Sequence, residues 1–187
     1  MGTSILVTGP TKSGKSEWAE QLAAQQKQPV VYVATSQLNL DDAEWQARVE
    51  LHRRRRASAW QTLEVPTELV ATLATGGTAE CWIVDSLGTW TANCLEQSDE
   101  HWAQTVEGLL AAIAAFPGTL IMVAEETGWG VVPAYPLGRT FRDRLGHLTR
   151  QVAAIADITY LVVAGFAIDL RQSGTPVAAL EPDNVRQ

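Results

Sequence analysis

Cysteine is scarce in this chain of 187 residues, which has only Cys81 and Cys94. Their spacing fits no metal-ligand motif, and two cysteines give no disulfide framework. Long apolar runs are missing too, since no stretch reaches the roughly 20 apolar residues that span a bilayer. The first residues show no basic segment followed by an apolar one. We therefore expect no signal peptide, no membrane span and a cytoplasmic protein.

Positive charge is in the minority, with 14 Lys and Arg against 21 Asp and Glu and a formal net charge of −7. Proteins that bind nucleic acid usually carry an overall basic face, so we expect no nucleic-acid partner. The 46% hydrophobic and 19% charged residues are typical of a globular domain rather than a disordered chain. One local basic cluster is nevertheless enough to bind a phosphorylated small molecule.

Short apolar runs alternate with helical patterns along the chain, which predicts an α/β fold with a mainly parallel sheet. We expect one domain over residues 1–171 and a loose C-terminal tail over residues 172–187. The predicted strands are Ser4–Thr8, Val30–Ala34, Trp60–Val65, Trp82–Asp85, Thr119–Ala124 and Ile158–Ala164, with a continuation at Phe166–Leu170. The predicted helices are Lys15–Gln26, Asp41–Arg55, a segment opened by Pro66, Glu100–Ala115 and Arg139–Ala156.

A phosphate-binding loop is predicted directly after the first strand. The segment matches G-x-x-x-x-G-K-[ST] in full, with an apolar strand before it and a helix after it. Glycines let such a loop turn its N–H groups inward, and the helix N-terminus adds partial positive charge. Lys15 would reach the β- and γ-phosphates and the Ser16 hydroxyl would ligate Mg²⁺. The alternative is a glycine-rich turn that binds nothing. The predicted loop consists of Gly9, Pro10, Thr11, Lys12, Ser13, Gly14, Lys15 and Ser16.

Asp85 closes the apolar run Cys81-Trp82-Ile83-Val84, which is the position of a Walker-B aspartate. From there its carboxylate could hold Mg²⁺ directly or through water. The alternative is an aspartate that caps a helix beginning near Leu87. The complete phosphate loop nearby favours the metal role.

One histidine, His52, is followed directly by Arg53, Arg54, Arg55 and Arg56. Arginine suits phosphate because its planar fork makes paired, charge-assisted hydrogen bonds. The flanking positive charge also disfavours protonation of His52 and keeps the imidazole nucleophilic. A neutral imidazole could attack the α-phosphorus of a nucleotide. The residues alone favour the alternative, a solvated basic helix face with a bystander histidine.

Taken together, the motifs resemble the bifunctional adenosylcobinamide kinase / adenosylcobinamide-phosphate guanylyltransferase family of cobalamin biosynthesis. The resemblance runs from Ile5 to about Leu170, and its specificity comes from the order of the motifs. They are Gly9–Ser16, Tyr32–Ser36, Asp41-Asp42, Arg48–Arg53, Trp60–Glu64, Val84–Leu87, Gly128–Pro133 and Arg139–Asp143.

The resemblance implies a P-loop NTPase (RecA-like) three-layer fold, a homotrimer and two reactions. The first phosphorylates adenosylcobinamide with ATP or GTP. The second transfers GMP from GTP to adenosylcobinamide phosphate through a guanylylated histidine, which corresponds to His52. The implied catalytic residues are therefore His52 and Lys15, with Mg²⁺ held by Ser16 and Asp85. The implied nucleotide contacts beyond the loop are Ala34, Thr35, Ser36, Arg53, Arg54, Arg55, Arg56, Glu64 and Asp85.

The chain departs from the family pattern at two places. Glu125-Glu126-Thr127 stands where Asn-Glu is frequent, and Thr149-Arg150 stands where Asn-Gln is frequent. Two other functions stay open at this point: a different small-metabolite P-loop kinase, and a non-catalytic nucleotide-sensing module. Trp129, in a loop with three glycines, could cover a corrinoid.

Overall fold

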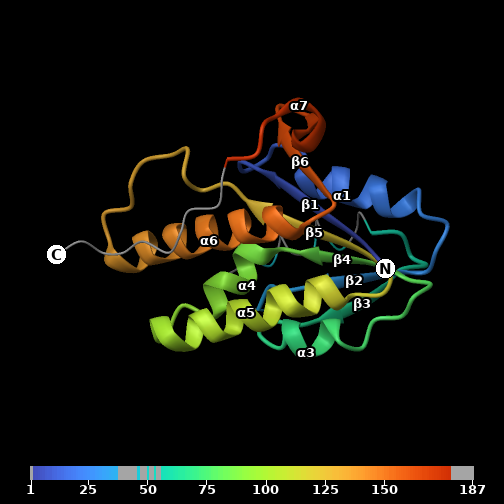
Figure 1. Cartoon of the computed structure of the whole chain (residues 1–187), viewed down its shortest axis with the longest axis horizontal. Helices are drawn as coiled ribbons and strands as arrows, with labels where there is room; N and C mark the ends of the chain where they lie inside the picture. Colours follow the sequence, from blue (N-terminus) through green and yellow to red (C-terminus); the bar gives the residue numbers. More distant parts are fainter. Residues whose placement is uncertain (1, 38–45, 47–49, 51–52, 54–55, 178–187) are drawn as a thin grey trace.

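Seven strands form one sheet at the centre of the molecule (Figure 1). The computed structural model describes residues 2–37, 46, 50, 53 and 56–177. The strands are β1 (Thr3–Gly9), β2 (Val30–Ala34), β3 (Gln61–Glu64), β4 (Cys81–Asp85), β5 (Thr119–Glu125), β6 (Ile158–Val163) and β7 (Phe166–Asp169). Their order across the sheet is β3-β2-β4-β5-β1-β6-β7. All neighbouring pairs are parallel except β6 and β7, so the predicted, mainly parallel sheet is confirmed.

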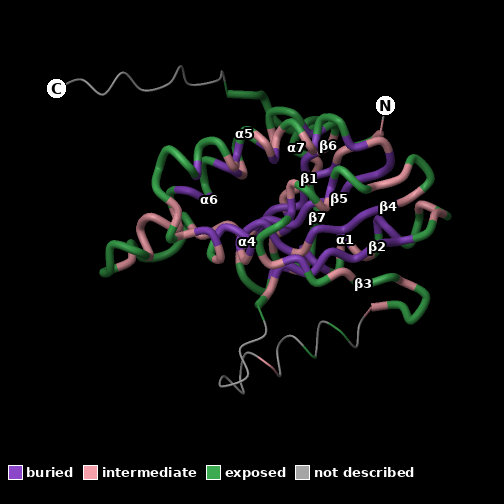
Figure 2. The backbone as a smooth tube through the Cα atoms, turned by 90° about the horizontal axis from the view of Figure 1, so that it is seen from below, coloured by how far each residue is buried: buried purple, intermediate pink, exposed green. Residues whose placement is uncertain are grey.

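Helices cover both faces of the sheet and complete three layers. They are α1 (Lys15–Ala24), α3 (Leu69–Leu73), α4 (Leu87–Asn93), α5 (Asp99–Ala115), α6 (Pro136–Ile155) and α7 (Leu170–Ser173). Alternate residues of a strand point to opposite faces of the sheet, so the apolar strands contribute side chains to two separate cores. One core joins the sheet to α3, α4, α5 and α6, which lie together in Figure 1, and the other joins it to α1. Figure 2 shows the buried residues concentrated in the strands between these layers.

Several element boundaries differ from the sequence prediction for local reasons. α6 begins at Pro136 rather than Arg139, because proline is well tolerated at the first turn of a helix. The helix expected from Pro66 begins at Leu69. Of the helix predicted for Asp41–Arg55, the structure describes three residues, Gln46, Glu50 and Arg53, and all three are helical. The rest of that prediction lies outside the described residues.

The predicted end of the domain at residue 171 falls within α7. Residues 178–187 lie outside the described part of the chain, so the loose tail stays a prediction. Among the described residues, no helix is both long enough and apolar enough to cross a membrane.

The parallel register gathers the ends of five strands at one edge of the sheet. Gly9 pairs with Glu125, and Ala34 pairs with both Glu64 and Asp85. The carboxyl edge of an open parallel sheet is where ligands of α/β proteins bind. The fold therefore brings the predicted site residues from distant parts of the sequence to this edge.

Candidate nucleotide site

The loop between β1 and α1 has the backbone that a phosphate cradle requires. Gly14 has φ 100° and a Cβ at Gly9 would overlap the carbonyl oxygen of Val162, so both positions need glycine. Ser13 N–H donates to the Pro10 carbonyl at 3.3 Å, and this bond closes the turn. α1 begins at Lys15, which places the loop at a helix N-terminus where anions are stabilised.

Lys15 and Ser16 are buried at the base of this loop, although both are polar. The Lys15 ammonium donates to the Pro10 carbonyl oxygen at 3.3 Å and has three N–H donors in all. A buried ammonium is stabilised by an anion beside it. Thr11 and Lys12 are exposed on the outside of the turn. The arrangement is that of a preformed polyphosphate site.

Two neighbouring segments hold the loop in place. Gly165 N–H, in the turn between β6 and β7, donates to the Ser13 carbonyl at 3.0 Å. Glu126 N–H, just after β5, donates to the Gly9 carbonyl at 2.9 Å. The loop is therefore anchored from both adjacent strands.

Asp85 lies at the carboxyl end of β4 and is held by Tyr32 of β2. The Tyr32 hydroxyl donates to Asp85 Oδ2 at 2.6 Å. Burial, and then the charge of Asp85, raise the pKa of Tyr32, so the phenol stays a proton donor. The guanidinium of Arg56 lies 3.8 Å from the centre of the Tyr32 ring, which is a cation–π contact. Arg56, from the basic segment, is thus tied to the predicted Walker-B position.

The alternative interpretation of Asp85 as a helix cap does not fit the structure. Ser86 is the N-cap of α4, and its hydroxyl accepts from Thr89 N–H at 3.1 Å. Thr35 is fully buried and exchanges two hydrogen bonds with the backbone of Ser86, at 2.7 and 2.9 Å. Thr35 therefore connects the ends of β2 and β4 rather than facing solvent.

Glu64, one of the nucleotide contacts that the resemblance implies, ends β3 and pairs with Arg53 at 3.3 Å. Both side chains are about half exposed, so this ion pair contributes little to stability. β3 is four strands from β1, which places Glu64 about 19 Å from the phosphate loop along the edge. Ala34 and Ser36 lie between these two ends. His52, Arg54 and Arg55 lie outside the described residues.

Glu125, to which the motifs assign no role, is an unusual group at this edge because its carboxyl group is buried. It ends β5, which lies between the strand of the phosphate loop and the strand of Asp85. Its Oε1 accepts from the Ser86 hydroxyl at 2.6 Å, and its Oε2 is buried without a hydrogen-bond partner. Burial is the main cause that raises its pKa, while the Ser86 bond and Lys15 lower it and Asp85 raises it. The departure from Asn at this position was the available signal.

Glu125 is accommodated by a glycine on the facing helix. Gly88 of α4 lies so close that a Cβ there would overlap Glu125 Oε2. Orphaned buried carboxylate oxygens in a native structure are uncommon and call for an explanation such as a ligand or a functional proton. The site is therefore richer in carboxyl groups than the motifs alone indicated.

Mg²⁺ suits the donors found here. The Ser16 hydroxyl is a hard oxygen donor at the start of α1, and Asp85 supplies a carboxylate at the end of β4. The Oε2 of Glu125, at the same edge of the sheet, is a further oxygen without a protein partner. These observations fit a divalent cation bound together with a polyphosphate.

Comparison with known proteins identifies relatives over most of the chain. A bifunctional adenosylcobalamin biosynthesis protein of Pseudomonas aeruginosa is 39% identical over 168 residues, covering 89% of this chain and 96% of its own. Another protein of that name, from Escherichia coli, is 35% identical over 185 residues, covering 89% and 99%.

A solved structure from Pyrococcus horikoshii has a TM-score of 0.57 at 8% identity, covers 90% of this chain and 86% of its own, and supports the fold alone. The family resemblance noted from the motifs is confirmed by a match over residues 5–170. With that match and the two close relatives, this chain belongs to the cobinamide kinase / cobinamide phosphate guanyltransferase family of enzymes.

Proposed function

We propose that the enzyme phosphorylates adenosylcobinamide with ATP or GTP and then transfers GMP from GTP to adenosylcobinamide phosphate. The product is adenosylcobinamide-GDP, an intermediate of cobalamin biosynthesis. Family membership supports the pair of reactions, and membership in a family of enzymes disfavours a purely nucleotide-sensing module. The observation that carries the proposal is the anchored phosphate loop, with Lys15 buried beneath it.

In the kinase reaction, the acceptor hydroxyl oxygen attacks the γ-phosphorus and the bond to the β–γ bridging oxygen breaks. The hydroxyl loses its proton and ADP or GDP leaves. Lys15 and the loop N–H groups stabilise the negative charge that spreads over the phosphoryl oxygens. Ser16 and Asp85 would hold Mg²⁺, which supplies further neutralisation of the polyphosphate charge.

In the guanylyltransfer reaction, a ring nitrogen of His52 attacks the α-phosphorus of GTP and pyrophosphate leaves. An oxygen of adenosylcobinamide phosphate then attacks the same phosphorus and the P–N bond breaks, which regenerates His52. The support comes from the neighbours of His52. Arg53 pairs with Glu64 and Arg56 stacks on Tyr32, so these two arginines, which follow His52 in the sequence, lie at the carboxyl edge. Together with Arg53 and Arg56, Arg54 and Arg55 would bind the phosphates of the nucleotide.

A labelled-GTP experiment tests the covalent step. The enzyme is incubated with GTP labelled at the α-phosphate, denatured and assayed for acid-labile, base-stable label on protein. Wild type should acquire the label and release it to adenosylcobinamide phosphate, whereas His52→Ala should not become labelled. His101→Ala is the matched control, because His101 is on α5 and has no assigned role. Label that persists in His52→Ala would exclude His52 as the nucleophile.

Other properties implied by the resemblance are proposed with it. We propose a cytoplasmic homotrimer, and the exposed Phe166 and Ile168 on β7 are side chains of the kind that subunit contacts bury. Sedimentation analysis tests the trimer. A different small-metabolite kinase remains the competing function, and it predicts ADP formation without labelled protein.

A further inference from the structure

An exposed apolar loop joins β5 to α6 beside the phosphate site. From Gly128 to Gly138 the sequence is Gly-Trp-Gly-Val-Val-Pro-Ala-Tyr-Pro-Leu-Gly, without a single charged residue. Large exposed apolar groups in a row are unusual on a soluble protein and mark binding surfaces. The exposed fractions are 60% for Trp129, 94% for Val131, 58% for Val132, 80% for Tyr135 and 59% for Leu137. We call these five side chains the apolar platform.

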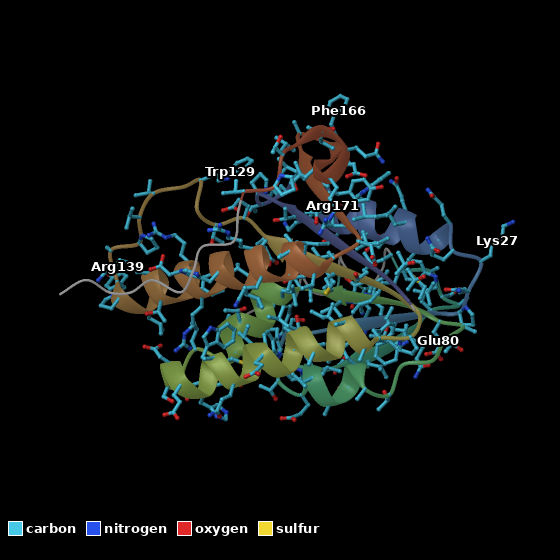
Figure 3. All side chains as sticks on the ribbon, viewed as in Figure 1. Lys27, Glu80, Trp129, Arg139, Phe166 and Arg171 are labelled. Carbon is cyan, nitrogen blue, oxygen red and sulfur yellow. The ribbon has the colours of Figure 1, made fainter. Side chains whose placement is uncertain are left out.

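The backbone beneath the platform is held by specific contacts. Gly128 N–H donates to Glu126 Oε1 at 2.7 Å. Arg139 Nη1 donates to the carbonyls of Pro133 and Ala134 at 3.1 and 2.7 Å. Figure 3 shows Trp129 and Arg139 at opposite ends of this loop, on the sheet side and the helix side. Arg139 thus fixes the backbone while the apolar side chains remain in solvent.

The segment that leads into the platform is bonded to the phosphate loop. Glu126, two residues before Gly128, donates its N–H to the Gly9 carbonyl of the phosphate loop at 2.9 Å. In a reactive complex the acceptor oxygen must lie about 3–3.5 Å from the phosphorus it attacks. The rest of a large acceptor then has to lie over the segments that flank the phosphate loop. The loop after β5 is one of these segments, and it is uncharged and apolar.

We propose that the apolar platform binds the corrin macrocycle of the acceptor and holds it while its side arm enters the phosphate site. This inference rests on the proposed function and names the surface that recognises its substrate. A corrin offers broad, methyl-bearing faces, which suit contact with indole, phenol and branched aliphatic side chains. Both reactions use a corrinoid acceptor, whereas guanylylation of the enzyme does not. The platform therefore acts in acceptor binding in both halves and not in the reaction with GTP.

The test compares variants at the two ends of one helix. Leu137, in the platform, and Ile155, which is 42% exposed at the other end of α6, are similar in size and exposure. About 27 Å of helix separates them. Leu137→Ala and Trp129→Ala should each raise the KM for adenosylcobinamide and for its phosphate several-fold to tenfold or more. Ile155→Ala should leave both KM values unchanged. In all three variants, labelling of the enzyme by GTP in the absence of corrinoid should match wild type.

Each other outcome has a distinct meaning. Unchanged corrinoid KM values in Trp129→Ala and Leu137→Ala would refute the proposal that the platform binds the corrin macrocycle. A platform variant that changes the sedimentation coefficient while its corrinoid KM stays at the wild-type value would show that the surface binds a second copy of the chain instead. A wild-type enzyme that neither phosphorylates adenosylcobinamide nor becomes labelled by GTP would refute the proposed function itself. Trp129→Phe should recover most of the affinity, because an aromatic face is retained.

Discussion

Gly88 of α4 faces the buried carboxyl group of Glu125, and this contact makes a sharp prediction for Gly88→Ala. A methyl group at residue 88 would overlap Glu125 Oε2 and would lie 2.8 Å from its Cδ. Either the carboxyl group stays and the site is overpacked, or it moves and loses the 2.6 Å bond from the Ser86 hydroxyl. Each outcome costs about 1–3 kcal/mol. The helix gains up to about 1 kcal/mol because alanine replaces glycine.

The free energy of unfolding should therefore fall by roughly 0–3 kcal/mol in Gly88→Ala, measured by urea denaturation. In a Glu125→Ala background the obstructing carboxyl group is absent. The same substitution should then raise stability, by up to about 1 kcal/mol. Gly146→Ala is the matched control, since Gly146 is also helical and an added Cβ there would meet nothing within 4 Å. That control should be stabilising in both backgrounds.

The decisive quantity is the coupling energy between residues 88 and 125. We expect about 1–3 kcal/mol, which equals the steric or hydrogen-bond cost and does not contain the helix-propensity term. A coupling energy below about 0.5 kcal/mol would refute the placement of the Glu125 side chain against α4.

Three further predictions concern protonation and buried polar groups. The pKa of Glu125 is raised in the folded protein, so its protonated form favours folding. The free energy of unfolding should fall as pH rises from the ordinary carboxyl range through this raised pKa. Glu125→Gln should lose this pH-dependent step when unfolding is measured from acidic to neutral pH. A variant with the same pH profile as wild type would contradict the prediction. Arg144 is buried and donates to the Cys94, Leu95 and Gln97 carbonyls. Arg144→Met should cost about 2–4 kcal/mol in thermal unfolding, and a cost under about 1 kcal/mol would show that water replaces these bonds. Burial raises the pKa of Cys81 to about 12 and also raises that of Cys94. Neither thiol should react with iodoacetamide until the protein is unfolded, and rapid alkylation of native protein would contradict their burial.

Much of the architecture could be predicted because its causes are local. The runs Ser4–Thr8 and Val30–Ala34 are apolar and lie within the observed strands, and Gly9 and Gly14 stand where the loop backbone requires glycine. The phosphate loop is formed by eight consecutive residues, so the sequence motif is enough to predict its local structure. The order of several separate motifs was enough to indicate the family, which the comparisons confirmed.

The strand order could not be derived from the sequence, because it depends on which distant segments pack together. Its consequence is that β5 lies between β1 and β4, which brings Glu125 beside the phosphate loop and Asp85. Nothing near residue 125 in the sequence shows that Gly88 leaves room for its carboxyl group. The buried position of the Glu125 carboxyl group was therefore not predicted.

The sequence by itself determined where the candidate polyphosphate site lies and which residue types surround it, since a contiguous loop and its flanking helix create that site. Only the tertiary structure decided how the remaining groups are combined. Tyr32 meets Asp85 across 53 residues, Arg56 stacks on that tyrosine, and Trp129 remains in solvent although similar side chains such as Trp90 are buried. Burial and such contacts depend on packing between layers of the fold, which residue type alone does not specify.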